Sequence, residues 1–334
     1  MQMAPLLGIF LPQDKSIPDV FIPMPSEVKA LYVTAPVALT SSWLDKIANV
    51  ADTTEINSLV INVKDGDSLY LNKAMADTVR ALKQKGIYPI ARIVVFQDND
   101  LVKKRPDLAL KTKAGQIWSD KSYHWVDPSS KEVWDYNLDI ADKALDMGFE
   151  EINFDYFRFP SDGSLNKIVY PFYDGITPRQ EIIAKAAEYL TSRIRQNKPE
   201  AKISLDIFGY TFLKNDDLGI GQKLSLLAGY FDAIAPMVYP SHFSAGNFGF
   251  QNPAAHPYEV ILETLKKGQE EISKSGIEQN FAIRPWIQDF DMGAIYDAKM
   301  VRQEIQAISD AGLHSGWMVW NPSNTYDKTK FLPK

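Results

Sequence analysis

The sequence predicts a single (β/α)8 barrel of the TIM type, and three observations support this fold class. A short β-rich run, turn residues and a helical stretch follow one another eight times along the chain. Alternating strands and helices at this spacing indicate a parallel sheet, and eight units favour closure into a barrel. No glycine-rich dinucleotide-binding fingerprint follows the first strand, which argues against an open doubly wound sheet. A length of 334 residues suits one such barrel with insertions.

The predicted elements are taken from runs of β-branched and aromatic residues and from the helical stretches between them. We assign residues 29–334 to the barrel domain and residues 1–28 to an N-terminal arm or linker. The predicted strands are 29–34, 58–64, 87–95, 149–157, 202–208, 233–239, 282–287 and 316–320. The predicted helices include 42–51, 73–85, 131–147, 178–197, 257–275 and 298–311.

The first 28 residues differ from the rest in composition. Four prolines within residues 12–28 indicate a linker that leads into the barrel. Residues 1–12 are apolar, and no Lys or Arg precedes Lys15. This stretch fits either the start of a chain from which a signal peptide has been removed or a strand or arm that packs on the barrel.

Composition excludes several classes of function. A net charge of −6 without a visible basic face argues against nucleic-acid binding. The chain has no cysteine, and its four histidines lack the spacing of metal ligands, so we expect neither a metal site nor another cofactor. No apolar run is long enough to span a bilayer. The oligomeric state stays open.

Alternation along the strands predicts which side chains point into the barrel. Outward-facing residues of a barrel strand pack under helices, and the residues between them face the axis. Polar inward residues near the C-terminal strand ends mark the face where barrel enzymes carry out their chemistry. The predicted inward polar sets are Asn62 and Lys64 in the second strand, Glu151, Asn153 and Asp155 in the fourth, and Ser204 and Asp206 in the fifth.

Two long connections are expected on this catalytic face. Residues 96–130 follow the third strand, and residues 240–256 follow the sixth. Long loops at this face usually shape a binding site, although for any single aromatic residue in them packing of the loop is the favoured role. The aromatic residues and histidines in question are Trp118, His124 and Trp125 in the first loop and His242, Phe243, Phe248 and Phe250 in the second.

Asp155 and Asp206 form the strongest candidate for a catalytic pair. Both are predicted to face inward at matching heights on neighbouring strands, which lie ~4.8 Å apart. Glycoside hydrolysis needs two such carboxyl groups, one as nucleophile or base and one as the acid for the leaving oxygen. Either Asp could instead cap a helix or pair with a nearby cation.

Cations and aromatic rings surround this pair at the predicted strand ends. Lys64, Arg92 and Arg158 place positive charge near the acids, and a neighbouring cation keeps a carboxylate ionised. Lys64 could alternatively form a Schiff base. Sugars bind where aromatic platforms alternate with fixed polar groups. The remaining predicted substrate contacts at the mouth are Tyr32, Tyr239, Trp286, Gln288, Trp320 and Asn321, together with His124, Trp125 and His242 from the loops.

Five segments on the fourth to eighth strands resemble one family. They are EEINFDYFRFPSDG, SLDIFGY, DAIAPMVYPSHF, RPWIQDF and GWMVWNPSNTY, and the start VKALYVTAPVA is similar to that family's first strand. The family is a bacterial group of glycoside hydrolase-like domains first described as a domain of unknown function. The resemblance covers about residues 28–326 and implies a (β/α)8 barrel related to the α-amylase and α-galactosidase group.

The resemblance also implies roles for individual residues. The nucleophile of that group is an Asp at the end of strand four, which corresponds to Asp155. The acid/base lies after strand five or six, and Asp206 is the candidate because strand six ends in Tyr239 without a carboxylate. An Arg often stands two residues before the nucleophile, whereas this chain has Asn153 there, so the cation that faces Asp155 stays open.

We therefore expect a glycoside hydrolase that acts on a poly- or oligosaccharide. The alternatives are a carbohydrate-binding barrel without catalysis that serves the cell envelope, and a sugar-directed lyase or transferase that uses the same cleft. Family members are commonly secreted or attached to the envelope, so the resemblance implies an extracellular or envelope location. A cytoplasmic location is the alternative.

Overall fold

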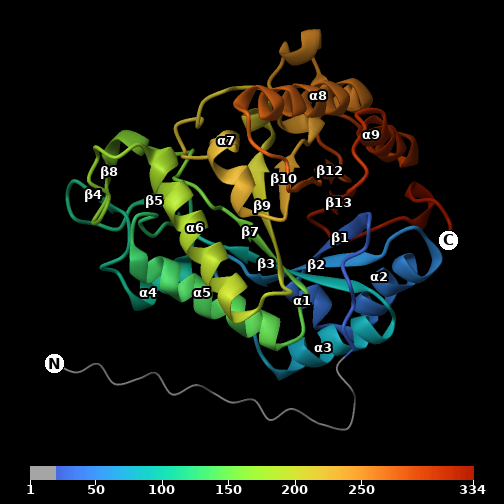
Figure 1. The fold of residues 1–334 in the computed structure, drawn as a ribbon, viewed down its shortest axis with the longest axis horizontal. Helices are drawn as coiled ribbons and strands as arrows, with labels where there is room; N and C mark the ends of the chain where they lie inside the picture. The colour runs from blue at the N-terminus through green and yellow to red at the C-terminus, as the bar shows by residue number, and fades with distance from the viewer. Residues whose placement is uncertain (1–19) are drawn as a thin grey trace.

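The computed structural model describes residues 20–334, and within them eight strand positions form one closed parallel barrel (Figure 1). Each position agrees with a predicted strand, which confirms the fold class. The apolar start and part of the predicted linker fall on residues 1–19, outside the described residues. The strands are β1 (Val28–Thr34), β2 (Ser58–Lys64), β3 (Tyr88–Val94), β7 (Glu151–Asp155), β9 (Lys202–Phe208), β10 (Ala233–Met237), β11 (Ala282–Ile283) with β12 (Trp286–Gln288) in the seventh position, and β13 (Gly316–Trp320).

The barrel closes where the first strand meets the last. β1 pairs with β13 in parallel, with Val28 opposite Gly316, and β9 pairs with β10 on the far side. Gly316 has a φ of +88°, and a Cβ there would lie 2.0 Å from the carbonyl oxygen of Val28. Only glycine lets the two backbones approach this closely, so the residue at 316 is required for closure.

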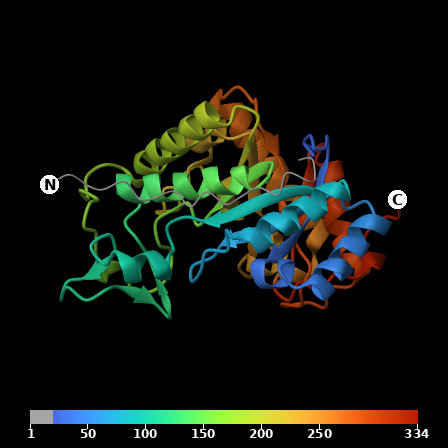
Figure 2. The same cartoon turned by 90° about the horizontal axis from the view of Figure 1, so that it is seen from below.

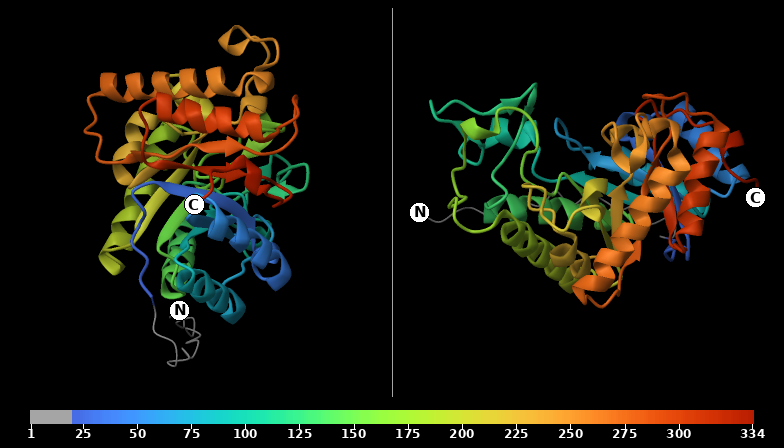
Figure 3. Two further views of the ribbon diagram at one scale, coloured as in Figure 1. Left: turned by 90° about the vertical axis from the view of Figure 1, so that its right-hand side faces the viewer. Right: turned by 90° about the horizontal axis from the view of Figure 1, so that it is seen from above.

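Helices cover the outside of the barrel and bury the outward faces of the strands. Figure 3 shows α8 and α9 running side by side over the last strands. Isoleucine, valine and leucine from alternate strand positions pack against these helices in one large apolar core. The helices are α1 (Ala35–Ala38), α2 (Ser41–Thr53), α3 (Lys73–Gln84), α4 (Asn99–Lys104), α5 (Lys131–Asp146), α6 (Arg179–Asn197), α7 (Leu224–Leu227), α8 (Pro257–Ser275) and α9 (Ala298–Asp310).

Inside the barrel lies a smaller apolar cluster and a buried ion pair. Val60, Tyr88 and Met318 belong to the cluster, which fills the space between the strands. Glu151 pairs with Arg284 and also accepts a hydrogen bond from the hydroxyl of Tyr88 at 3.3 Å. Because the ion pair is surrounded by protein, removal of one partner would leave an uncompensated buried charge. These groups form the floor beneath the C-terminal mouth.

A lobe of short strands projects from the barrel at the C-terminal side of β3 and β7 (Figure 2). The connection after β3 contains α4 and the strands β4 (Lys111–Thr112), β5 (Ser119–Asp120) and β6 (Tyr123–His124). The connection after β7, residues 156–178, is also long, although the sequence pattern did not single it out. Its strand β8 (Ile168–Val169) pairs with β4, so the two connections form one unit.

The opposite end of the barrel is covered by the segment before β1. Ile22 packs against the inner apolar cluster, and its backbone N–H donates to Glu150 Oε1 at 3.0 Å. Within residues 20–334, no helix has the length and apolar character needed to cross a membrane.

Candidate active site

Asp155 ends strand β7 with its side chain at the mouth of the barrel. One carboxylate oxygen forms an ion pair with Arg92 of β3, and the other accepts the backbone N–H of Tyr156 at 2.5 Å. Tyr156 has a φ of +51°, which is rare for an aromatic residue and costs roughly 1–3 kcal/mol of backbone strain. The chain therefore turns sharply directly after Asp155, and the carboxylate is fixed at the strand end.

Asp206 of β9 lies beside Asp155 at the same height. Phe154 pairs with Leu205 in the register of the two strands, so the next residues on each strand are level, as the sequence predicts. Asp206 Oδ1 accepts hydrogen bonds from Asn153 Nδ2 at 2.8 Å and from Trp286 Nε1 at 2.7 Å. Burial, followed by the charge of Asp155, raises the pKa of Asp206 to about 8. Asp206 is therefore mostly protonated at neutral pH.

The second oxygen of Asp206 is the one that can carry the proton. Oδ2 accepts no hydrogen bond from the described residues and keeps a small contact with solvent. The residue as a whole is 1% exposed. Asp155, at 6% exposed, is the more accessible of the two carboxyl groups.

Arg92 lies beside both carboxyl groups and is the cation that faces Asp155. Besides its ion pair with Asp155, its Nε lies 3.8 Å from Asp206 Oδ2, and its Nη1 donates to Asn62 Oδ1 at 2.7 Å. The guanidinium also stands 5.7 Å from the ring centre of Tyr32. The cation thus comes from the neighbouring strand β3, while Asn153 supplies an amide to Asp206.

Lys64 does not face the mouth, contrary to the prediction from alternation. The pairing of β2 with β3 shifts register between Asn62 and Lys64, which places Lys64 opposite the outward-facing Ile93. Its ammonium forms an ion pair with Asp98 at 2.8 Å and lies 5.5 Å from the ring of Tyr136 on α5. The irregular register turns this lysine into the outer layer, away from Asp155.

Aromatic side chains at the ends of β10, β12 and β13 form the other half of the mouth. The ring of Trp320 lies 5.1 Å from Tyr239, 4.9 Å from Phe290 and 6.3 Å from His242, measured between centroids. Tyr32 and Trp286 meet edge to face at 6.4 Å nearer the carboxyl groups. Phe290 was not among the predicted contacts, although it directly follows the QD after the seventh strand.

Two predicted polar contacts are engaged in holding the loops of this half. Gln288 accepts the backbone N–H of Ser241 at 3.2 Å and donates to the carbonyl of Phe290 at 2.9 Å. Asn321 donates to the carbonyls of Asp289 at 2.5 Å and Thr325 at 2.9 Å. Both amides therefore fix the positions of the rings around them.

The remaining predicted contacts lie in the loops beside β7. Arg158 stacks on Trp125 and Tyr156, with its guanidinium carbon 5.0 and 5.1 Å from the two ring centres. His124 contacts Asn99, with 2.9 Å between its Nδ1 and Asn99 Oδ1, and so ties the strand β6 to α4. Arg158 and Trp125 adjoin the carboxyl pair, whereas the bond of His124 belongs to the packing of the lobe.

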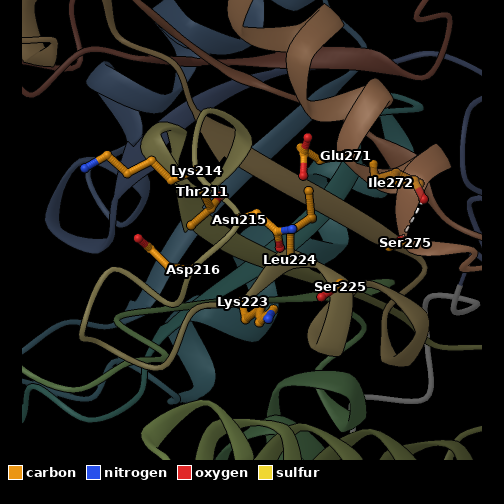
Figure 4. Close-up of a pocket in the computed structure, with 10 residues that line it drawn as sticks. All are labelled: Thr211, Lys214, Asn215, Asp216, Lys223, Leu224, Ser225, Glu271, Ile272 and Ser275. Carbon is orange, nitrogen blue, oxygen red and sulfur yellow. Dashed lines mark hydrogen bonds between the residues drawn. The ribbon is translucent and has the colours of Figure 1, made fainter.

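Two hollows in the surface lie away from the carboxyl pair. Figure 4 shows one of them, between the 3-10 helix Gly209–Phe212, α7 and α8, lined by residues such as Lys214, Leu224 and Glu271. The other lies near Glu55 and Trp317, at the end where β1 begins. Neither includes a predicted site residue. Residues 20–334 contain no group of three or more His, Asp or Glu side chains that could hold a metal ion.

Comparisons with known proteins agree with the architecture. A family profile described as "Putative glycosyl hydrolase domain" matches residues 30–326. No sequence among the curated proteins matches the chain.

Solved structures of low sequence identity share the fold. The glycoside hydrolase domain of PgaB (BpsB) from Bordetella bronchiseptica is 10% identical, with a TM-score of 0.63 over 89% of this chain and 95% of that one. That of PelA from Pseudomonas aeruginosa is 14% identical, with a TM-score of 0.53 over 90% and 97%. The α-galactosidase TtGalA from Thermus thermophilus is 15% identical, with a TM-score of 0.54 over 91% of this chain and 60% of that one.

Proposed function

Because the chain belongs to this family of glycosyl hydrolase domains, we propose that it hydrolyses a poly- or oligosaccharide with Asp155 as nucleophile and Asp206 as general acid/base. One observation carries the proposal: two level carboxyl groups share Arg92 but stand in opposite environments. Asp155 is in an ion pair, and Asp206 is buried with a pKa raised to about 8. An acid and a nucleophile differentiated in this way are what glycoside hydrolysis needs at neutral pH.

The proposed reaction has two steps. Asp155 attacks the anomeric carbon while Oδ2 of Asp206 gives its proton to the glycosidic oxygen, so that the bond to the leaving sugar breaks and a glycosyl ester forms on Asp155. Asp206, now ionised, takes a proton from water, and the oxygen of that water attacks the anomeric carbon and releases Asp155. Arg92, beside both groups, stabilises the negative charge as it moves from one carboxyl group to the other.

A second candidate, a carbohydrate-binding barrel without catalysis and with a role at the cell envelope, is favoured by the burial of the pair. Both oxygens of Asp155 already have partners, and Asp206 is 1% exposed. On this account the aromatic half of the mouth binds sugar and the carboxyl groups only stabilise the barrel.

A screen of cell-wall and storage polysaccharides with wild type and Asp155→Asn separates the two candidates. We expect reducing ends from at least one polysaccharide with the wild type and a loss of roughly 10³-fold or more in kcat with the variant, the scale on which removal of a central catalytic group acts. Asp310→Asn, an exposed carboxylate on α9, is the matched control and should keep full activity. Equal product from both Asp155 forms would contradict the nucleophile role, and binding without product from any form would favour the second candidate.

A further inference from the structure

Arg158 is a buried cation without an acidic partner. It is 6% exposed, and no carboxylate within residues 20–334 lies at ion-pair distance from its guanidinium. The other two cations predicted at the mouth are neutralised, Lys64 by Asp98 and Arg92 by Asp155. A buried charge is costly unless it is paired, so an unpaired guanidinium at this place needs an explanation.

The surroundings of Arg158 hold it in place and leave part of it free. Its Nη1 donates to the carbonyl of Phe159 and to Ser161 Oγ, both at 3.1 Å. The guanidinium carbon stands 4.6 Å from the ring centre of Phe208, at the end of the strand that carries Asp206. Its other two nitrogens, Nε and Nη2, make no hydrogen bond to the described residues, and neither is fully shielded from solvent.

The position of Arg158 places this free edge beside the carboxyl pair. Burial lowers the pKa of the Arg158 guanidinium, and the charges of Asp155 and Asp162 act against this effect without forming an ion pair. Asp155 with Arg92 carries no net charge, and a protonated Asp206 adds none. The exposed carboxylate of Asp162 reaches Arg158 only through the hydroxyl of Ser161. Among the buried groups on this side of the mouth, one positive charge is therefore left over, on a planar group whose unbonded nitrogens suit a bidentate anion.

We propose that Arg158 binds an acidic substituent of the sugar, so that the substrate is an anionic glycan. This inference rests on the proposed function and names its substrate class. A uronic-acid carboxylate and a sulfate ester share the chemistry that the guanidinium recognises. Stacking on Trp125, Tyr156 and Phe208 fixes the orientation of the fork before the substrate arrives, which reduces the entropy cost of binding.

The test measures binding to oligosaccharides in pairs that differ only in charge. The probes are an oligogalacturonate and a hyaluronan hexasaccharide, each with its carboxyl-reduced counterpart, and a sulfated oligosaccharide with its desulfated counterpart. Calorimetry uses the full chain with Asp206→Asn, which stops turnover and leaves the ion pair of Arg92 with Asp155 in place. We expect one acidic probe to bind about tenfold or more tighter than its neutral counterpart, the scale of one charge-assisted hydrogen bond. The probe that binds shows whether the group is a carboxylate or a sulfate.

Substitution of the arginine then assigns the preference. Arg158→Met keeps contact with the three rings and should reduce the preference to within about threefold, since the charge and its donors are gone. Arg158→Lys keeps the charge without the planar pair of donors and should retain part of the preference. This variant provides the test if Arg158→Met fails to fold. Arg179→Met is the matched control, because Arg179 also stacks on aromatic rings, Phe159 and Tyr170, in the lobe.

Three results would overturn the proposal: no acidic probe binds, acidic and neutral members bind equally, or the preference survives in Arg158→Met. Failure of the proposed function looks different. Charge-dependent binding with no cleavage by the wild type would contradict the hydrolase and leave the role of Arg158 standing. Cleavage of a neutral polysaccharide at the same rate by wild type and Arg158→Met would support the hydrolase and contradict the role of Arg158.

Discussion

The two halves of the barrel mouth are built differently. On the side of β3, β7 and β9, Arg92, Asp155 and Asp206 stand on strands, and fixed hydrogen bonds hold them. On the side of β10, β12 and β13, His242 and Phe290 come from loops and meet other rings only by contacts of 4.9–6.3 Å. Hydrogen bonds hold the charged groups directly on one side. On the other side the rings contact one another, and Gln288 and Asn321 hold the loops that carry them.

This difference separates two kinds of effect on a reaction. Groups that stabilise a transition state must already be oriented when the substrate binds, so their loss lowers kcat. Aromatic platforms contact the substrate and the transition state alike, so their loss raises KM and leaves kcat nearly unchanged. Substitutions on the two sides should therefore give separable kinetic results.

The largest effect in this comparison is expected for Asp206→Asn. The amide keeps an oxygen for the bonds from Asn153 and Trp286 but has no proton to give, so kcat should fall by about 10²–10⁴-fold. Because only protonated Asp206 can act and its pKa is about 8, wild-type kcat/KM should decline as the pH rises through about 8. The variant should lack this decline and should recover rate on glycosides whose leaving group needs no proton.

The control for this prediction is the same pH series with Asp310→Asn, which should reproduce the wild-type profile. A wild-type rate that stays level from pH 6 to 10, or full activity in Asp206→Asn, would show that Asp206 has a structural role only.

A smaller effect is expected on the aromatic side. Trp320→Ala removes the ring that joins Tyr239, His242 and Phe290, and KM should rise by roughly 2–10-fold, in line with about 0.5–1.5 kcal/mol for an aromatic contact. Trp43→Ala, an exposed tryptophan on α2, should leave KM unchanged. If Trp320→Ala lowers kcat more than it raises KM, the division between the two halves is wrong.

Regular strand alternation is the reason that much of this site could be predicted. The inward set in β7 and the level partner in β9 follow from a period of two, which the structure keeps as far as Asp155 and Asp206. The alternation gives the wrong direction for Lys64, because one shift of register in β2 turns its side chain outward. No residue type in that strand indicates the shift.

Pairings across strands and between loops could not be predicted from local sequence. From the sequence, Asp155 could form an ion pair with Arg92, Arg158 or Lys64. The stagger of the strands in the structure brings Arg92 to it. The pairing of β4 with β8 joins segments about 57 residues apart through two-residue strands, which carry almost no periodic signal. Phe290 is likewise brought to Trp320 by the folding of its loop.

The most direct test of the central claim measures the protonation of Asp206 itself. Carboxyl ¹³C shifts of the aspartate-labelled chain, followed from pH 4 to 10, should contain one signal that titrates near pH 8. That signal should be missing in Asp206→Asn and should titrate at lower pH in Asp155→Asn, because the charge of Asp155 is one of the causes that raise the pKa of Asp206. If no aspartate signal that depends on Asp206 titrates above about pH 6, the division into nucleophile and acid is contradicted.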